Sequence, residues 1–145
     1  MAKFNLTHSI IVKSDLENVF EHISNPDQIK NWVSNLVELR NYTPPISVGT
    51  TYDMITKSMG QETLTTSKVL TYDVPKKFAV SADSSSVIGT FTHSCQALTD
   101  GVEVTIHWDM EMSGLIMNLF APIAKYQMNK LIQEDLNNIK TLVEA

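Results

Sequence analysis

The stretch LIMNLFAPIAKYQMNKLIQEDLNNIKTLVEA, residues 115–145, decides the fold of this chain. It contains no glycine, and its single proline, Pro122, lies early. A helix of this length would reach roughly 40 Å at about 1.5 Å per residue, which exceeds the diameter of a small domain. The helix therefore needs a long partner. Because most of the chain before it predicts strands, we expect that partner to be a wide antiparallel sheet.

The N-terminal part of the chain predicts one strand followed by two short helices. Residues 4–12 alternate between apolar and polar side chains, which is typical of a half-buried strand. Ser14 then begins a capping box with Glu17, and apolar residues follow at helical spacing, so a short helix is expected. Asn25 and Pro26 are the expected N-cap and first residue of a second short helix.

Six further strands are expected between the short helices and the long one. Their expected ranges are 36–42, 50–57, 62–72, 78–82, 87–98 and 102–112. Turns rich in proline, glycine and serine separate them, and Asp100-Gly101 is a two-residue hairpin signal. The predicted fold is α+β, with a curved antiparallel sheet of about seven strands wrapped around one long C-terminal helix. The length predicts a single domain over residues 1–145.

The alternation of the last two strands predicts which side chains face the helix. In residues 102–112 the apolar face carries Val102, Val104, Ile106, Trp108, Met110 and Met112. In residues 87–98 the same reasoning turns inward Phe91, His93, Cys95 and Ala97. The parity of the second strand is ambiguous, so the facing of three residues stays open: Glu38, Arg40 and Tyr42.

The first half of the long helix lacks the bulk that a solid core needs. Its inward stripe begins at Ile116 and Phe120 and becomes small and polar at Ala124 and Gln127, before Leu131. We therefore expect the helix and the curved sheet to leave a pocket there, with methionines as an adaptable lining. The predicted ligand-binding residues are Met54, Phe91, His93, Cys95, Trp108, Met110, Met112, Phe120, Ile123, Ala124 and Gln127.

Composition is that of an ordinary globular protein, with 145 residues, 43% hydrophobic and 19% charged. A formal charge of -5 argues against nucleic-acid partners and anionic membranes, because binding to either needs clustered Lys and Arg. No run suits membrane insertion, and the N-terminus predicts a strand and not a signal peptide, so a cytoplasmic location is expected. The single cysteine, Cys95, excludes an internal disulfide and a thiolate metal cage. Neither a metal nor a cofactor is predicted.

His93 is the only candidate for a catalytic residue. An inward histidine without a certain carboxylate partner is more often structural than an acid–base group, because general catalysis needs both geometry and a tuned pKa. Cys95 is more often a small buried hydrophobe than a nucleophile. His107 and Asp109 have a metal-like spacing, but they face outward with no third ligand nearby. The sequence contains no glycine-rich phosphate loop, nucleophile elbow or H-E-x-x-H motif.

Four segments carry a resemblance to a known family. They are SIIVKSDLENVFEHISNPDQIKNW at residues 9–32, SVGTTYDM at 47–54, YDVPKKF at 72–78 and EDLNNIKTLVE at 134–144. In this order and spacing the chain resembles the START-like, helix-grip superfamily (SRPBCC), and most closely its polyketide cyclase/dehydrase and lipid-transport branch. The resemblance covers nearly the whole chain and implies a deep cavity between the sheet and the long helix. It implies no universal catalytic motif, so enzyme status does not transfer.

Three functional hypotheses follow, in order of preference. The first is a binding module that holds a small hydrophobic or aromatic molecule, lipid-like or polyketide-like, between the sheet and the helix. The second is a cyclase or dehydratase acting on a polyketide-like substrate, with His93 as the acid–base group. The third is an interaction protein that needs no ligand. The expected oligomeric state is a monomer or a weak homodimer, and whether the protein is an enzyme stays open.

Overall fold

The computed structural model describes residues 2–58, 60–114 and 117–145. The elements follow in the order β1 (Ala2–Val12), α1 (Leu16–Ser24), α2 (Pro26–Ile29), β2 (Leu36–Arg40), β3 (Thr51–Ser58), β4 (Gln61–Asp73), β5 (Lys77–Asp83), β6 (Val87–Leu98), β7 (Gly101–Met112) and α3 (Met117–Val143). Ile116, the expected start of the inward stripe, and part of the expected 58–60 turn lie outside the described residues.

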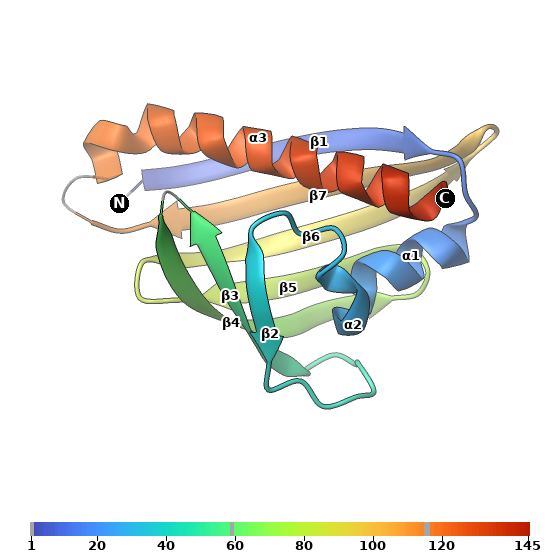
Figure 1. The fold of residues 1–145 in the computed structure, drawn as a ribbon, viewed down its shortest axis with the longest axis horizontal. Helices are drawn as coiled ribbons and strands as arrows, with labels where there is room; N and C mark the ends of the chain where they lie inside the picture. Colours follow the sequence, from blue (N-terminus) through green and yellow to red (C-terminus); the bar gives the residue numbers. More distant parts are fainter. Residues whose placement is uncertain (1, 59, 115–116) are drawn as a thin grey trace.

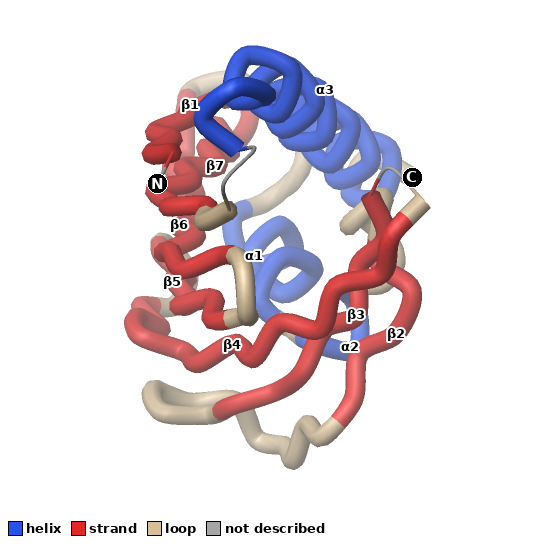
Figure 2. The backbone as a smooth tube through the Cα atoms, turned by 90° about the vertical axis from the view of Figure 1, so that its left-hand side faces the viewer, coloured by secondary structure: helices blue, strands red, loops and turns tan. Residues whose placement is uncertain are grey.

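The strands form one antiparallel sheet in the order β1-β7-β6-β5-β4-β3-β2. Only β1 leaves the sequential order, and it pairs with β7 along its whole length, from Ala2 opposite Met112 to Val12 opposite Val102. α3 crosses one face of the sheet, close to β1 and β7 (Figure 1). The sheet bends from β1 round to β2, and in Figure 2 the helices α1 and α2 appear inside the curve. The predicted α+β helix-grip fold is therefore confirmed.

Local capping determines where the two short helices begin. Asp15, and not the expected Ser14, is the N-cap of α1, because its side chain accepts a hydrogen bond of 2.8 Å from the amide of Asn18. Asn25 caps α2 as predicted, with Pro26 as the first helical residue. α2 is one turn long, and it leads into a segment whose Trp32 is only 4% exposed.

The core lies where the second half of α3 meets β1, α1 and β7. The near-heptad positions of α3 are all buried: Ile132, Leu136, Ile139 and Val143. The inward residues predicted for β7 are buried or half-buried, and so are Phe91, His93 and Cys95 on β6, whereas Ala97 near the hairpin is exposed. Together these residues join the helix to one half of the sheet.

The open question about the second strand is resolved by β2 and the residues after it. Glu38 and Arg40 are exposed, whereas Tyr42 is half-buried and its ring meets the ring of Tyr52 edge-on, with centroids 6.4 Å apart.

None of the helices in residues 2–58, 60–114 and 117–145 is long and apolar enough to span a membrane.

Candidate ligand-binding cavity

A cavity of about 230 Å³ lies between the concave face of the sheet, the α2 region and α3. Its walls come from alternate residues of five strands, because successive side chains of a strand point to opposite faces. From β5, β6 and β7 the lining residues are Phe78, Val80, Ala82, Val87, Phe91, His93, Ile106, Trp108, Met110 and Met112. This wall is apolar except at His93.

Two aromatic rings form the middle of the apolar wall. Phe91 on β6 lies directly opposite Trp108 on β7, and the two rings stack with centroids 5.1 Å apart and planes inclined by 27°. Both side chains are only half-buried. Because both residues line the cavity, a flat apolar molecule inside it would contact their aromatic rings.

The wall formed by β3 and β4 is richer in hydroxyl groups. Its lining residues are Tyr52, Met54, Thr56, Ser58, Thr63, Thr65 and Ser67. The register between the strands sets Tyr52 opposite Ser67 and Thr56 opposite Thr63. One side of the cavity is therefore apolar, and the side across from it offers donors and acceptors that can orient a ligand.

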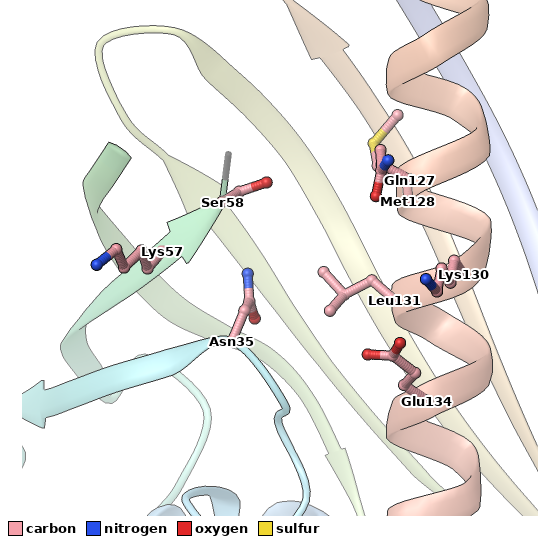
Figure 3. A pocket seen from close by; sticks show the side chains of 8 residues that line it. All are labelled: Asn35, Lys57, Ser58, Gln127, Met128, Lys130, Leu131 and Glu134. Carbon is pink, nitrogen blue, oxygen red and sulfur yellow. The ribbon is translucent and has the colours of Figure 1, made fainter. Parts of the chain in front are cut away.

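A smaller hollow of about 140 Å³ adjoins the cavity and shares four of its lining residues: Asn35, Ser58, Met128 and Leu131. In Figure 3, Asn35, Lys57 and Ser58 lie on one side of this hollow, and α3 presents Gln127 to Glu134 on the other. Because α3 packs mainly against β1, it stands off from the β3 side of the sheet. We infer from the shared lining that this hollow is the entrance to the cavity.

His93 is 7% exposed, and its ring contacts Trp32 edge-on at 5.4 Å and Phe78 at 6.1 Å. Burial lowers its pKa to about 4, against a smaller opposing effect from the backbone of Phe78. The imidazole is therefore uncharged at neutral pH. Its Nδ1 is buried and has no hydrogen-bond partner among the described residues. A buried polar atom without a partner is costly to the folded state.

Asp135 on α3 is a cavity residue that sequence reasoning missed. It is 3% exposed, and its Oδ1 accepts hydrogen bonds from the backbone amide and the hydroxyl of Ser34, both at 2.9 Å. Burial raises its pKa to about 6, although the bonds from Ser34 oppose that rise. One signal was available, because Asp135 lies three residues after Ile132 and four before Ile139, on the buried stripe of the helix.

The structure brings together six of the eleven predicted ligand-binding residues in the lining of the cavity. They are Met54, Phe91, His93, Trp108, Met110 and Met112. Gln127 lines the entrance instead. Cys95 is buried and does not line the cavity, and burial raises the pKa of its thiol to about 12, so the thiol stays protonated at neutral pH.

The other three predicted residues lie on the first half of α3, away from the cavity. Phe120 and Ile123 are 46% and 49% exposed, and Ala124 is half-buried against the core. The predicted stripe reaches the cavity only near Leu131, because the helix extends past that end of the cavity. The helical residues that line the cavity are Met128, Leu131 and Asp135.

Two further histidines have structural or peripheral positions. His8 bonds through Nε2 with Oδ1 of Asn129 at 2.7 Å and thereby links β1 to α3. His107 contacts the hydroxyl of Thr7 at 2.6 Å on the outer face of the sheet. Within the described part of the chain, no group of three or more His, Cys, Asp or Glu side chains could hold a metal ion.

Several solved structures superpose on this chain over nearly its whole length. A protein of Thermus thermophilus superposes with a TM-score of 0.84 at 11% identity, over 96% of each chain. The Zhui aromatase/cyclase from a Streptomyces species gives 0.83 at 11% identity, over 99% of this chain and 94% of that one. The di-domain ARO/CYC StfQ of the steffimycin pathway gives 0.80 at 10% identity, over 98% of this chain and 51% of that one. At these identities the likeness shows the fold alone.

Comparison of the sequence with protein-family models assigns the chain to a family. No curated protein matches the chain with significant similarity. The family model described as polyketide cyclase / dehydrase and lipid transport matches residues 3–144. The match covers nearly the whole chain, in agreement with the resemblance carried by the four segments. The chain belongs to the polyketide cyclase / dehydrase and lipid transport family.

Proposed function

We propose that the protein binds a small hydrophobic or aromatic molecule, lipid-like or polyketide-like, in the cavity between the sheet and α3. The observation that carries this proposal is a cavity of about 230 Å³ with an apolar aromatic wall on one side and a row of hydroxyl groups on the other. Pockets that bury most of a small ligand have this composition.

The size of the cavity indicates the size of the ligand. Typical ligand pockets measure roughly 300–1,000 Å³, so this one lies just below the lower end of that range. It suits one or two fused aromatic rings or a short acyl chain better than a long lipid. Apolar burial supplies the main driving force, at about 25 cal/mol per Å² of surface removed from water. The hydroxyl groups of β3 and β4 orient the polar end of the ligand.

Calorimetry with α-naphthylmethanol tests this proposal, because the probe combines two fused rings with one uncharged polar group. The wild-type protein is expected to bind one molecule per chain. Thr65→Trp is expected to abolish binding, because Thr65 lines the cavity and an indole there would occupy it.

Thr66→Trp is the matched control, since Thr66 is the next residue of β4 and is exposed on the opposite face. It is expected to bind as wild type does. Saturable binding that is unaffected by Thr65→Trp would place the probe elsewhere and overturn the proposal, and so would the absence of any binding to the wild-type protein.

A second candidate function is acid–base catalysis at His93, favoured by its place as the one histidine among the residues that line the cavity. An uncharged imidazole can take the α-proton of a β-hydroxy ketone, and the imidazolium so formed can give that proton to the departing hydroxyl group, which leaves as water. The C–O bond breaks as the C=C bond forms, which is the dehydration that a dehydratase performs. His93→Phe is expected to abolish dehydration of a β-hydroxy aryl ketone without lowering stability at neutral pH. Equal rates for the variant and the wild-type protein would count against this function.

A further inference from the structure

Asp135 places a single carboxylate in the wall of a largely apolar cavity. Ser34 occupies its Oδ1 with two hydrogen bonds, and no hydrogen bond reaches its Oδ2 from the described residues. Because Asp135 lines the cavity and is almost fully buried, Oδ2 is the atom left for a molecule inside it. A buried carboxylate is costly unless it is paired, so its position favours a cationic partner.

Within the described residues, no salt bridge supplies that partner: the ion pairs formed there are Lys3 with Glu111 and Lys140 with Glu144. The other two ionisable groups of the cavity wall are uncharged at neutral pH, since burial raises the pKa of Tyr52 and lowers that of His93. Lys57 and Lys130 line only the adjoining hollow, where both are exposed, as is Glu134.

The aromatic content of the lining favours the same kind of ligand. Trp32, Phe91 and Trp108 line the cavity together with Tyr52 and Phe78. Aromatic faces attract cations through their quadrupoles, and tryptophan does so most strongly. An apolar space that combines ring faces with one carboxylate oxygen is complementary to a hydrophobic molecule bearing a positive charge.

We propose that the cavity prefers hydrophobic amines, whose protonated nitrogen donates a hydrogen bond to Oδ2 of Asp135 while the apolar part lies against Phe91 and Trp108. This inference rests on the proposed function, because it assumes that the cavity binds small apolar molecules. It adds the chemical class of the ligand and assigns Asp135 as the residue that determines specificity.

The preference is expected to depend on pH. Asp135 loses its proton as the pH rises through about 6, whereas an alkyl amine stays protonated well above neutrality, so the two charges coexist from about pH 6 upward. The ionisable groups around Asp135 are Glu134 on the same helix, Tyr52 on β3, His93 on β6, and Lys57 and Lys130 at the entrance. Lys30, in the segment that holds Ser34, is exposed, and so are Glu17 and Glu21 on α1. His93 titrates near pH 4, below this window.

The test uses three probes with one naphthalene ring system and different charges: α-naphthylmethylamine, α-naphthylmethanol and α-naphthoate. Calorimetry on the wild-type protein at about pH 8 is expected to rank the amine first, about tenfold tighter than the alcohol, with naphthoate weakest. The advantage of the amine over the alcohol is expected to shrink at about pH 5, where Asp135 is mostly protonated.

Asp135→Asn removes the charge and keeps an oxygen that can accept the bonds from Ser34, so the variant is expected to fold. It should lose the preference for the amine over the alcohol. Glu134→Gln is the matched control, because Glu134 is the neighbouring carboxylate at the exposed entrance. It should retain the preference.

The outcomes separate this inference from the function on which it rests. Binding of the alcohol without a preference for the amine overturns the inference and leaves the proposed function standing. A preference that survives Asp135→Asn, or that Glu134→Gln removes equally, also overturns it. Failure of all three probes to bind overturns the proposed function itself.

Discussion

Replacing Asp135 by Asn should stabilise the folded protein at neutral pH. The carboxyl is 3% exposed, and burial raises its pKa from the ordinary 3.8 to about 6. At about 1.4 kcal/mol for each pKa unit, this difference corresponds to roughly 3 kcal/mol. Because the pKa is raised in the folded state, the favourable contribution is fully present below about pH 3.8 and is lost as the pH rises through about 6. The asparagine variant does not undergo this loss.

Urea unfolding monitored by tryptophan fluorescence measures the effect at a series of pH values from about 4 to about 7.5. The free energy of unfolding of Asp135→Asn, minus that of the wild-type protein, is expected to grow by roughly 2–3 kcal/mol across this range. Glu134→Gln, an exposed neighbour, should change stability by less than about 0.5 kcal/mol. A difference for Asp135→Asn that is flat with pH, or that falls as the pH rises, would refute the account of a buried, desolvated carboxylate.

The remaining predictions concern three other positions. His93→Phe should remove a loss of roughly 3 kcal/mol in the free energy of unfolding that the wild-type protein undergoes in acid. Because the pKa of His93 is lowered from 6.5 to about 4, its contribution to stability is present above pH 6.5 and is lost as the pH falls through about 4. Identical pH profiles of urea unfolding for the variant and the wild-type protein would contradict this. Cys95 should resist a thiol-specific disulfide reagent at about pH 8 until the protein is unfolded, since burial raises its pKa to about 12; rapid labelling of the folded protein would contradict its burial. Gly89→Ala should lower the free energy of unfolding in urea by about 1–3 kcal/mol, because a Cβ there would lie 2.6 Å from the carbonyl oxygen of Asp109. An unchanged free energy of unfolding would show that β6 and β7 can separate locally.

The order and type of the elements could be predicted because each depends on a local pattern. The alternation of residues 102–112 correctly predicts one face of β7, on which Val102, Val104 and Ile106 are buried. Asn25 and Pro26 are recognisable as a helix start without any tertiary information. The buried spacing of Ile132, Leu136, Ile139 and Val143 likewise follows from the helical period.

The cavity could be predicted only in part, because its lining depends on how the elements pack together. Met54, Phe91 and Trp108 follow from strand parity and line it. The contribution of the helix depends on where α3 lies along the sheet, which periodicity does not determine, so Phe120 and Ile123 were assigned to a cavity that they do not line.

Asp135 was missed for a related reason. A charged residue beside an apolar stripe is usually at its solvated edge, and only the contact with Ser34, 101 positions away in the sequence, makes burial of this one tolerable. The hydroxyl groups of β4 were equally hidden, because Leu64 and Leu70 lie on its other face, and the structure leaves both leucines exposed.

A crystal structure of the protein with α-naphthylmethanol would show whether the cavity holds a ligand. The expected result is one naphthalene ring system in the space bounded by Phe91, Trp108, Met128 and Leu131, with its hydroxyl towards the threonines of β3 and β4. An interior filled by the protein's own side chains, with the probe absent or bound only on the outer surface, would contradict it.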